Sequence, residues 1–151
     1  GLVNIAGGFV WGKVDAGSVA EWDRMYNINL KTAVAASAAA IPHLVKSRGR
    51  IVNVGAAAAG QAGAGMGAYA ASKAGVERLT QALSEELKDQ GVNVNAVLPS
   101  ILDTPANRSS MSEANYGRWV STVDLAQVIA FLLSDESAAV TGALIPVKGK
   151  V

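Results

Sequence analysis

Tyr69 and Lys73 are the residues whose types and spacing most directly indicate chemistry. They stand in the run Tyr-Ala-Ala-Ser-Lys at the start of a predicted helix, and four residues apart they project from one helical face. An ammonium beside a phenol stabilises the phenolate and lowers the phenol's pKa from about 10. Tyr69 would then act as a general acid or base on a carbonyl or an alcohol. The pair alone is a weak signal, because this spacing occurs by chance on many exposed helices.

Composition excludes several other kinds of site. The chain has 151 residues, half of them apolar, which fits one domain with a sizeable core. Its 13 Lys+Arg balance 12 Asp+Glu without a basic block, which argues against nucleic acid or an anionic membrane as partner. There is no cysteine and one histidine, His43, so we expect no metal site. The lack of cysteine also fits a cytoplasmic protein.

The elements that must position Tyr69 and Lys73 alternate between strand and helix. Apolar runs predict strands at 2–5, 50–54, 92–98 and 143–147, and helical periodicity predicts helices at 21–46, 69–90 and 121–133. This order predicts an α/β fold with a doubly wound parallel sheet, in a single domain over 1–151. The polar stretch 100–116 is expected to be a lid or a mobile loop. The three tryptophans are expected to be packing residues, with Trp119 a candidate wall of a substrate loop.

Further polar and small residues stand at fixed places on these predicted elements. Some end the first strand, one lies inside the long helix, and others end the third strand. In chain order they are Asn4, Ala6, Gly7, Asn29, Tyr69, Lys73, Pro99 and Thr104. Together the motifs resemble those of the short-chain dehydrogenase/reductase family. The resemblance covers nearly the whole chain, from Leu2 to Gly149.

The resemblance implies a Rossmann-like fold and an NAD- or NADP-dependent oxidoreductase that acts on a small alcohol or carbonyl substrate. It makes Tyr69 the proton donor or acceptor and Lys73 its pKa partner. It also gives Asn29 the role of holding a water that relays protons. The implied cofactor-binding residues are Asn4, Ala6, Gly7, Tyr69, Lys73, Pro99, Leu102 and Thr104. The family also implies a homodimer or homotetramer through the small-residue helix around 32–40.

Two departures from the family pattern bear on activity. The position of the family's serine, thirteen residues before Tyr69, is occupied by Ala56, so one carbonyl-polarising hydroxyl is missing. No glycine-rich phosphate loop follows a predicted strand, because the glycine-rich stretch 63–68 leads into the Tyr69 helix instead. We therefore expect the carboxyl-terminal half of the family's fold, from its fourth strand to its end. The alternative hypothesis is a non-catalytic or impaired member that acts as an association module.

Overall fold

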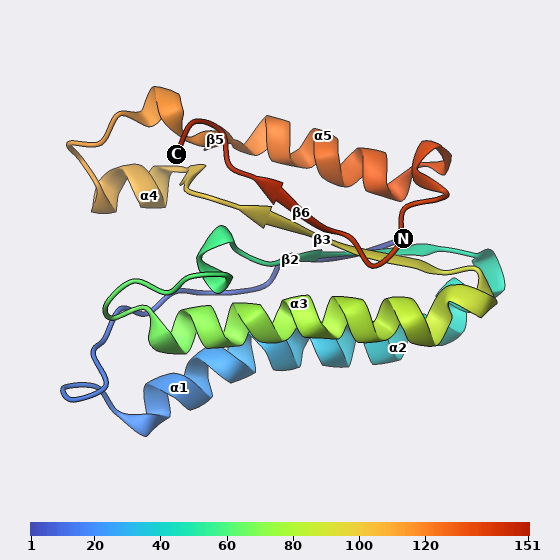
Figure 1. The fold of residues 1–151 in the computed structure, drawn as a ribbon, viewed down its shortest axis with the longest axis horizontal. Coiled ribbons are helices and arrows are strands. Elements are labelled where there is room, and N and C mark those ends of the chain that lie inside the picture. Colours follow the sequence, from blue (N-terminus) through green and yellow to red (C-terminus); the bar gives the residue numbers. More distant parts are fainter.

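The computed structural model describes all 151 residues, which build a four-stranded parallel sheet between helices (Figure 1). All neighbouring strands pair in parallel, so their carboxyl ends lie at one edge. In order across the sheet the strands are β1 (Leu2–Asn4), β2 (Arg50–Val54), β3 (Asn93–Pro99) and β6 (Leu144–Val147). The predicted α/β fold with four parallel strands is confirmed.

Helices cover both faces of this sheet, which confirms the predicted doubly wound arrangement (Figure 1). On one face lie α2 (Thr32–Ser47) and α3 (Gly67–Leu87), and on the other lies α5 (Thr122–Leu133). The core beneath α2 and α3 consists of Leu44, Ile51, Leu83, Leu87, Val92 and Val94. The core beneath α5 consists of Val52, Val97, Val120, Leu125 and Leu132. Because strand side chains alternate between faces, Ile51 and Val52 enter different cores.

The helix predicted at 21–46 is longer and less regular than expected. It begins with α1 (Val19–Met25), passes through the π-helical turn η1 (Tyr26–Lys31) and continues as α2 through Pro42 to Ser47. In the π turn the Thr32 backbone N–H donates to the Asn27 carbonyl, five residues earlier. Such turns inside α-helices are frequent at functional sites. Here the turn contains Asn29, the buried polar residue of this helix segment.

By length and composition alone, the continuous helix Val19–Ser47 could cross a membrane: it has 29 residues and a mean hydropathy of 1.2 in its most apolar window. Core helices of water-soluble proteins pass the same test. The buried side chains of α2 are Ala33, Ser37 and Leu44, and 22% of the helix's most apolar window is buried inside the structure.

The segment 100–116, expected to be a lid or a mobile loop, contains regular elements that its lack of periodicity did not predict. It contains β4 (Leu102–Asp103) and α4 (Pro105–Ser110), and the turn η4 (Tyr116–Arg118) leads to β5 (Val120–Ser121), which pairs with β4. Two local features fix it: Thr104 caps α4, and the Arg108 guanidinium bonds both Asp103 oxygens while lying 4.8 Å from the centre of the Tyr116 ring. A capping threonine followed by proline is a start signal for a helix.

The remaining helical turns are η2 (Ala57–Ala59), η3 (Lys88–Gln90) and η5 (Asp135–Ser137). Trp11 and Trp22, which we expected to be packing residues, are 59% and 41% exposed. Each lays its ring against a glycine just before or at the start of α3, Trp11 on Gly65 and Trp22 on Gly67. Trp119 is half-buried and lies 4.8 Å from the Tyr116 ring.

Candidate active site

Tyr69 and Lys73 occupy the first two turns of α3, at the carboxyl edge of the sheet. Tyr69 is half-buried, and Lys73 is only 6% exposed. The Lys73 Nζ donates a hydrogen bond of 2.8 Å to the carbonyl of Val54, the last residue of β2. An ammonium has three donors, so Lys73 has donors left for a ligand.

Burial sets the protonation of both groups. Desolvation lowers the pKa of Lys73 to about 8, because the buried ammonium loses hydration. Desolvation also raises the pKa of Tyr69 above its usual value near 10. In this structure burial of the phenol dominates, and a lowering of the Tyr69 pKa by Lys73 stays a prediction. At neutral pH Tyr69 is a protonated phenol that can donate a proton, and Lys73 is mainly an ammonium.

Asn29 joins the turn after β1 to the start of α3. Its Oδ1 accepts a hydrogen bond from the Gly8 N–H at 2.8 Å, and its Nδ2 donates to the Gly8 carbonyl at 3.0 Å. The same Nδ2 donates to the Ser72 hydroxyl at 2.9 Å, and that hydroxyl donates to the Tyr69 carbonyl at 2.7 Å. With 2% exposure, this amide fixes the turn against the catalytic helix. A relay water held by Asn29 stays a prediction, since the side chain's N–H donors are already engaged.

Gly7 brings the turn after β1 close to Lys73. A Cβ at Gly7 would lie 2.7 Å from Asn29 Oδ1 and 3.4 Å from Lys73 Nζ, so only glycine fits without displacing the amide. Ala6 and Gly7 are both exposed, which leaves a small-residue surface beside the ammonium. The pyrophosphate finds no matching glycine-rich loop here, because 63–68 follows the helical turn η2 rather than a strand.

The Asn4 side chain points into the face covered by α2 and α3. Its Nδ2 donates to Asn53 Oδ1 at 2.8 Å and to the Ser37 hydroxyl at 3.1 Å. Asn53 in turn donates to the Thr80 hydroxyl at 2.9 Å, and its own exposure is zero. We call Asn4, Ser37, Asn53 and Thr80 the polar ladder. The ladder fixes the strand end that carries the turn, so Asn4 reaches a cofactor only through the backbone it positions.

Pro99, Leu102 and Thr104 lie across the carboxyl edge from α3, where β3 leads into α4 (Figure 1). The Leu102 carbonyl accepts a hydrogen bond from Asn107 Nδ2 at 2.8 Å, and Thr104 Oγ1 accepts one from the Asn107 N–H at 3.2 Å. The Thr104 hydroxyl hydrogen is free to donate to a ligand.

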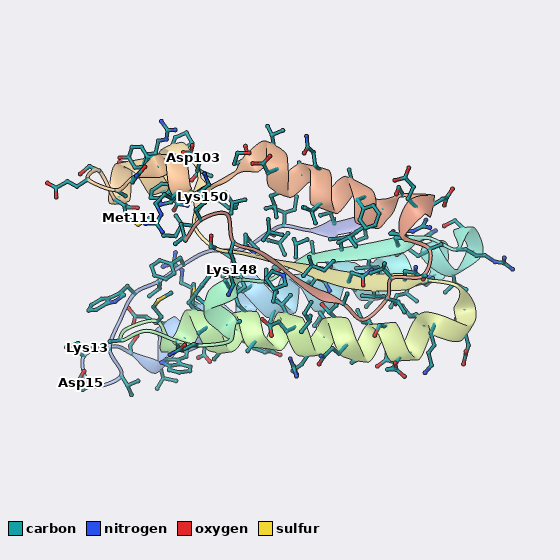
Figure 2. The ribbon with its side chains drawn as sticks, turned by 45° about the horizontal axis from the view of Figure 1, so that its top comes forward. Lys13, Asp15, Asp103, Met111, Lys148 and Lys150 are labelled. Carbon is teal, nitrogen blue, oxygen red and sulfur yellow. The ribbon has the colours of Figure 1, made fainter.

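Labelled side chains mark the two sides of this edge. Figure 2 shows Asp103, Met111 and Lys150 around α4, and Lys13 and Asp15 on the loop before α1. Hydrogen bonds through Ser72 join Asn29 to the start of α3, which carries Tyr69 and Lys73.

Ala56 is the second residue after the end of β2 and is 4% exposed. It precedes the all-alanine turn η2, so no hydroxyl is available at this position. His43 is exposed on α2, as expected of a surface residue. The structure shows no group of three or more His, Cys, Asp or Glu side chains that could hold a metal ion.

Sequence reasoning missed two contributors to the site. Ser72 is buried between Asn29 and the Tyr69 carbonyl, and its position directly before Lys73 in an otherwise small-residue run was a usable signal. Phe9 stacks edge-on against Tyr69, with ring centres 5.0 Å apart and an angle of 77° between the ring planes. No periodicity in the sequence marks Phe9.

A family model described as enoyl-(acyl carrier protein) reductase matches residues 1–149. The chain is also 38% identical over 138 residues to the 3-oxoacyl-(acyl-carrier-protein) reductase FabG of Thermotoga maritima, a match that covers 85% of this chain. The chain belongs to the short-chain dehydrogenase/reductase family. The resemblance read from the motifs is thereby confirmed.

Solved structures of short-chain dehydrogenases/reductases have the same fold. A short-chain type dehydrogenase/reductase from Mycobacterium ulcerans superposes with a TM-score of 0.91 at 27% identity, covering 98% of this chain and 58% of that one. A 4-hydroxyisoleucine dehydrogenase complexed with NADH gives a TM-score of 0.86 at 24% identity, covering 98% of this chain and 67% of that one, and supports the fold. The chain spans only 56% of the Thermotoga maritima relative.

Proposed function

We propose that this chain forms the catalytic part of an NAD- or NADP-dependent oxidoreductase that interconverts an alcohol and a carbonyl. The observation that carries the proposal is the placement of Tyr69 and Lys73 beside the exposed Ala6–Gly7 turn, at the carboxyl edge of a parallel sheet. Ligands of open α/β sheets bind at this edge. Relatives named as reductases and dehydrogenases support the reaction class.

Each residue has a task that its contacts permit. The nicotinamide, when bound, supplies or accepts the hydride. In the reducing direction Tyr69 gives its phenolic proton to the carbonyl oxygen, and in the oxidising direction the phenolate takes it back. The Lys73 ammonium, anchored on Val54, binds the nicotinamide ribose with its remaining donors. Thr104 and the Leu102 backbone hold the carboxamide of the ring.

The finer assignments rest on the same family pattern. Either NAD or NADP fits, because the strand that would select between them has no counterpart in this chain. We propose a homodimer or homotetramer formed through α1, α2 and α3. The exposed apolar side chains Trp22 on α1 and Val34 on α2 support that interface. A cytoplasmic location and a small-molecule substrate complete the proposal. The alternative, a non-catalytic association module, has no specific support among relatives named for their reactions.

Removal of the Tyr69 hydroxyl tests this proposal. In the enzyme that carries this chain together with its dinucleotide-binding part, Tyr69→Phe should lower turnover by about 100-fold or more, because proton transfer is lost. The free energy of unfolding should change little, since the ring and its contact with Phe9 remain. Tyr26→Phe, on an exposed ring of the π turn, is the matched control and should keep full turnover. Equal turnover in both variants would refute the proposed role of Tyr69.

A further inference from the structure

Two large aromatic side chains are exposed next to Tyr69. Phe9 is 54% exposed and meets the Tyr69 ring edge-on, and Trp11, two residues further, is 59% exposed. Exposed aromatic rings beside a candidate active site are typical of surfaces that bind apolar parts of a ligand. The arrangement goes beyond the proton-transfer machinery, because neither side chain can exchange a proton with a substrate.

The segment that carries these rings is fixed at both ends. Gly8 is held through its N–H and its carbonyl by Asn29. At the other end, Trp11 Nε1 donates to the Ala64 carbonyl at 3.0 Å, and the Gly12 N–H donates to the Gly65 carbonyl at 2.8 Å.

Gly65 also helps to hold the segment that carries Phe9 and Trp11. It has a φ of +77°, and a Cβ there would collide with the Trp11 ring. The rings are therefore held in place before any ligand arrives, which reduces the entropy lost on binding.

We propose that Phe9 and Trp11 form a subsite for an aromatic substituent on the substrate's carbonyl carbon, so that the enzyme prefers aryl aldehydes and ketones over small aliphatic ones. The inference rests on the proposed function, because the contact with Tyr69 joins the subsite to the reacting centre. A substrate ring that stacks against Phe9 would lie beside the Tyr69 ring, because the centres of the Phe9 and Tyr69 rings are 5.0 Å apart. In the reduction of benzaldehyde, the nicotinamide's hydride goes to the carbonyl carbon and the Tyr69 proton to its oxygen, which gives benzyl alcohol.

Steady-state kinetics with benzaldehyde and acetaldehyde test the subsite in the enzyme with its dinucleotide-binding part. Phe9→Ala should raise the KM for benzaldehyde about tenfold and leave that for acetaldehyde within about twofold, because one aromatic contact is lost. Phe131→Ala is the matched control: the only other phenylalanine, it is 42% exposed on α5 and should change neither. An equal loss of kcat on both substrates would mean that Phe9 only supports Tyr69. That result, or an unchanged KM, overturns the subsite.

A binding experiment separates failure of the subsite from failure of the proposed function. Saturation-transfer NMR with benzyl alcohol on the 151-residue chain needs no turnover. Binding should be weaker for Phe9→Ala and Trp11→Ala than for the unsubstituted chain, and unchanged for Phe131→Ala. Such a pattern sustains the subsite even if Tyr69→Phe keeps full turnover. Equal binding by all variants, or no binding by the unsubstituted chain, overturns the subsite while the proton-transfer role of Tyr69 stands.

Discussion

The two faces of the sheet are built from different chemistry. Beneath α5, Val52, Val97 and Leu132 are fully buried or nearly so and form part of an apolar cluster. On the opposite face, towards the carboxyl ends of the strands, the polar ladder runs from Asn4 through Asn53 to Thr80. The apolar face contributes hydrophobic free energy without direction, whereas hydrogen bonds on the other face fix positions. The site lies where the directional contacts are.

Polarity also changes along α3 itself. Tyr69 and Lys73 stand at its first turns, Thr80 joins the ladder in the middle, and Leu83 and Leu87 enter the apolar core near its end. The amino end of the helix thus carries buried polar groups that cost stability when unpaired, and its carboxyl end supplies the burial that offsets them. The comparison predicts that substitutions in the two apolar clusters affect stability, while those of the polar groups near the carboxyl edge affect activity or pH dependence.

The largest expected effect is on stability, from Leu132→Ala beneath α5. Leu132 has zero exposure, so truncation leaves a cavity and should lower the free energy of unfolding by about 2–5 kcal/mol. Turnover per folded molecule should stay unchanged, because Leu132 touches no site residue. Val123→Ala, 62% exposed on the same helix, should change stability by less than about 0.5 kcal/mol in denaturant unfolding. A loss of turnover without loss of stability in Leu132→Ala would break the comparison.

The second effect is the pH dependence caused by the buried ammonium of Lys73. Its folded pKa of about 8 lies below the ordinary 10.5, so between these values the unfolded chain binds more protons than the folded one. Stability should therefore rise with pH from about 8 to 10, and the penalty for the buried charge should be complete below pH 8. Lys73→Met removes this dependence.

Denaturant unfolding at pH 7 and pH 10 measures that effect. The stability of the unsubstituted protein relative to Lys73→Met should increase by about 3 kcal/mol over the interval. Tyr69 titrates in both proteins and cancels from the difference. Lys46→Met, at an exposed lysine on α2, should show no such change. If the stability difference between the unsubstituted protein and Lys73→Met is the same at pH 7 and pH 10, the Lys73 ammonium keeps its solvation in the folded protein.

Much of the fold follows from local sequence patterns. The apolar run 50–54 is a central strand, and the helix at 69–90 ends where expected, with Gly91 in the left-handed conformation that glycine favours. Ser121 caps α5 as its spacing to Asp124 predicts. These elements depend on nearby residues, which explains the agreement.

What the sequence did not reveal depends on contacts between distant segments. The π turn around Asn29 accompanies bonds to Gly8 and Ser72, residues 21 and 43 positions away. The raised pKa of Tyr69 comes from burial, which spacing along one helix cannot report. The helix in segment 100–116 could have been predicted from Thr104 and Pro105, which start it. The contact between Arg108 and Tyr116 could not be predicted from the sequence. The roles of the site residues remain predictions that the variants test.

The smallest expected effect comes from one oxygen atom at Ala56. Ala56 stands where the family pattern has a serine, so one hydroxyl is missing from the polar face. Ala56→Ser restores a hydrogen-bond donor for the charge that develops on the substrate's carbonyl oxygen. Turnover of a small carbonyl substrate should rise about tenfold, a fraction of what an optimally placed donor contributes. Ala58→Ser adds the same hydroxyl two residues on, in η2, and should leave turnover unchanged. Because Ala56 is 4% exposed, denaturant unfolding must accompany the kinetics to show that the oxygen is accommodated. A folded Ala56→Ser enzyme with unchanged turnover would mean that Tyr69 alone activates the carbonyl, and that the polar face is complete without the serine.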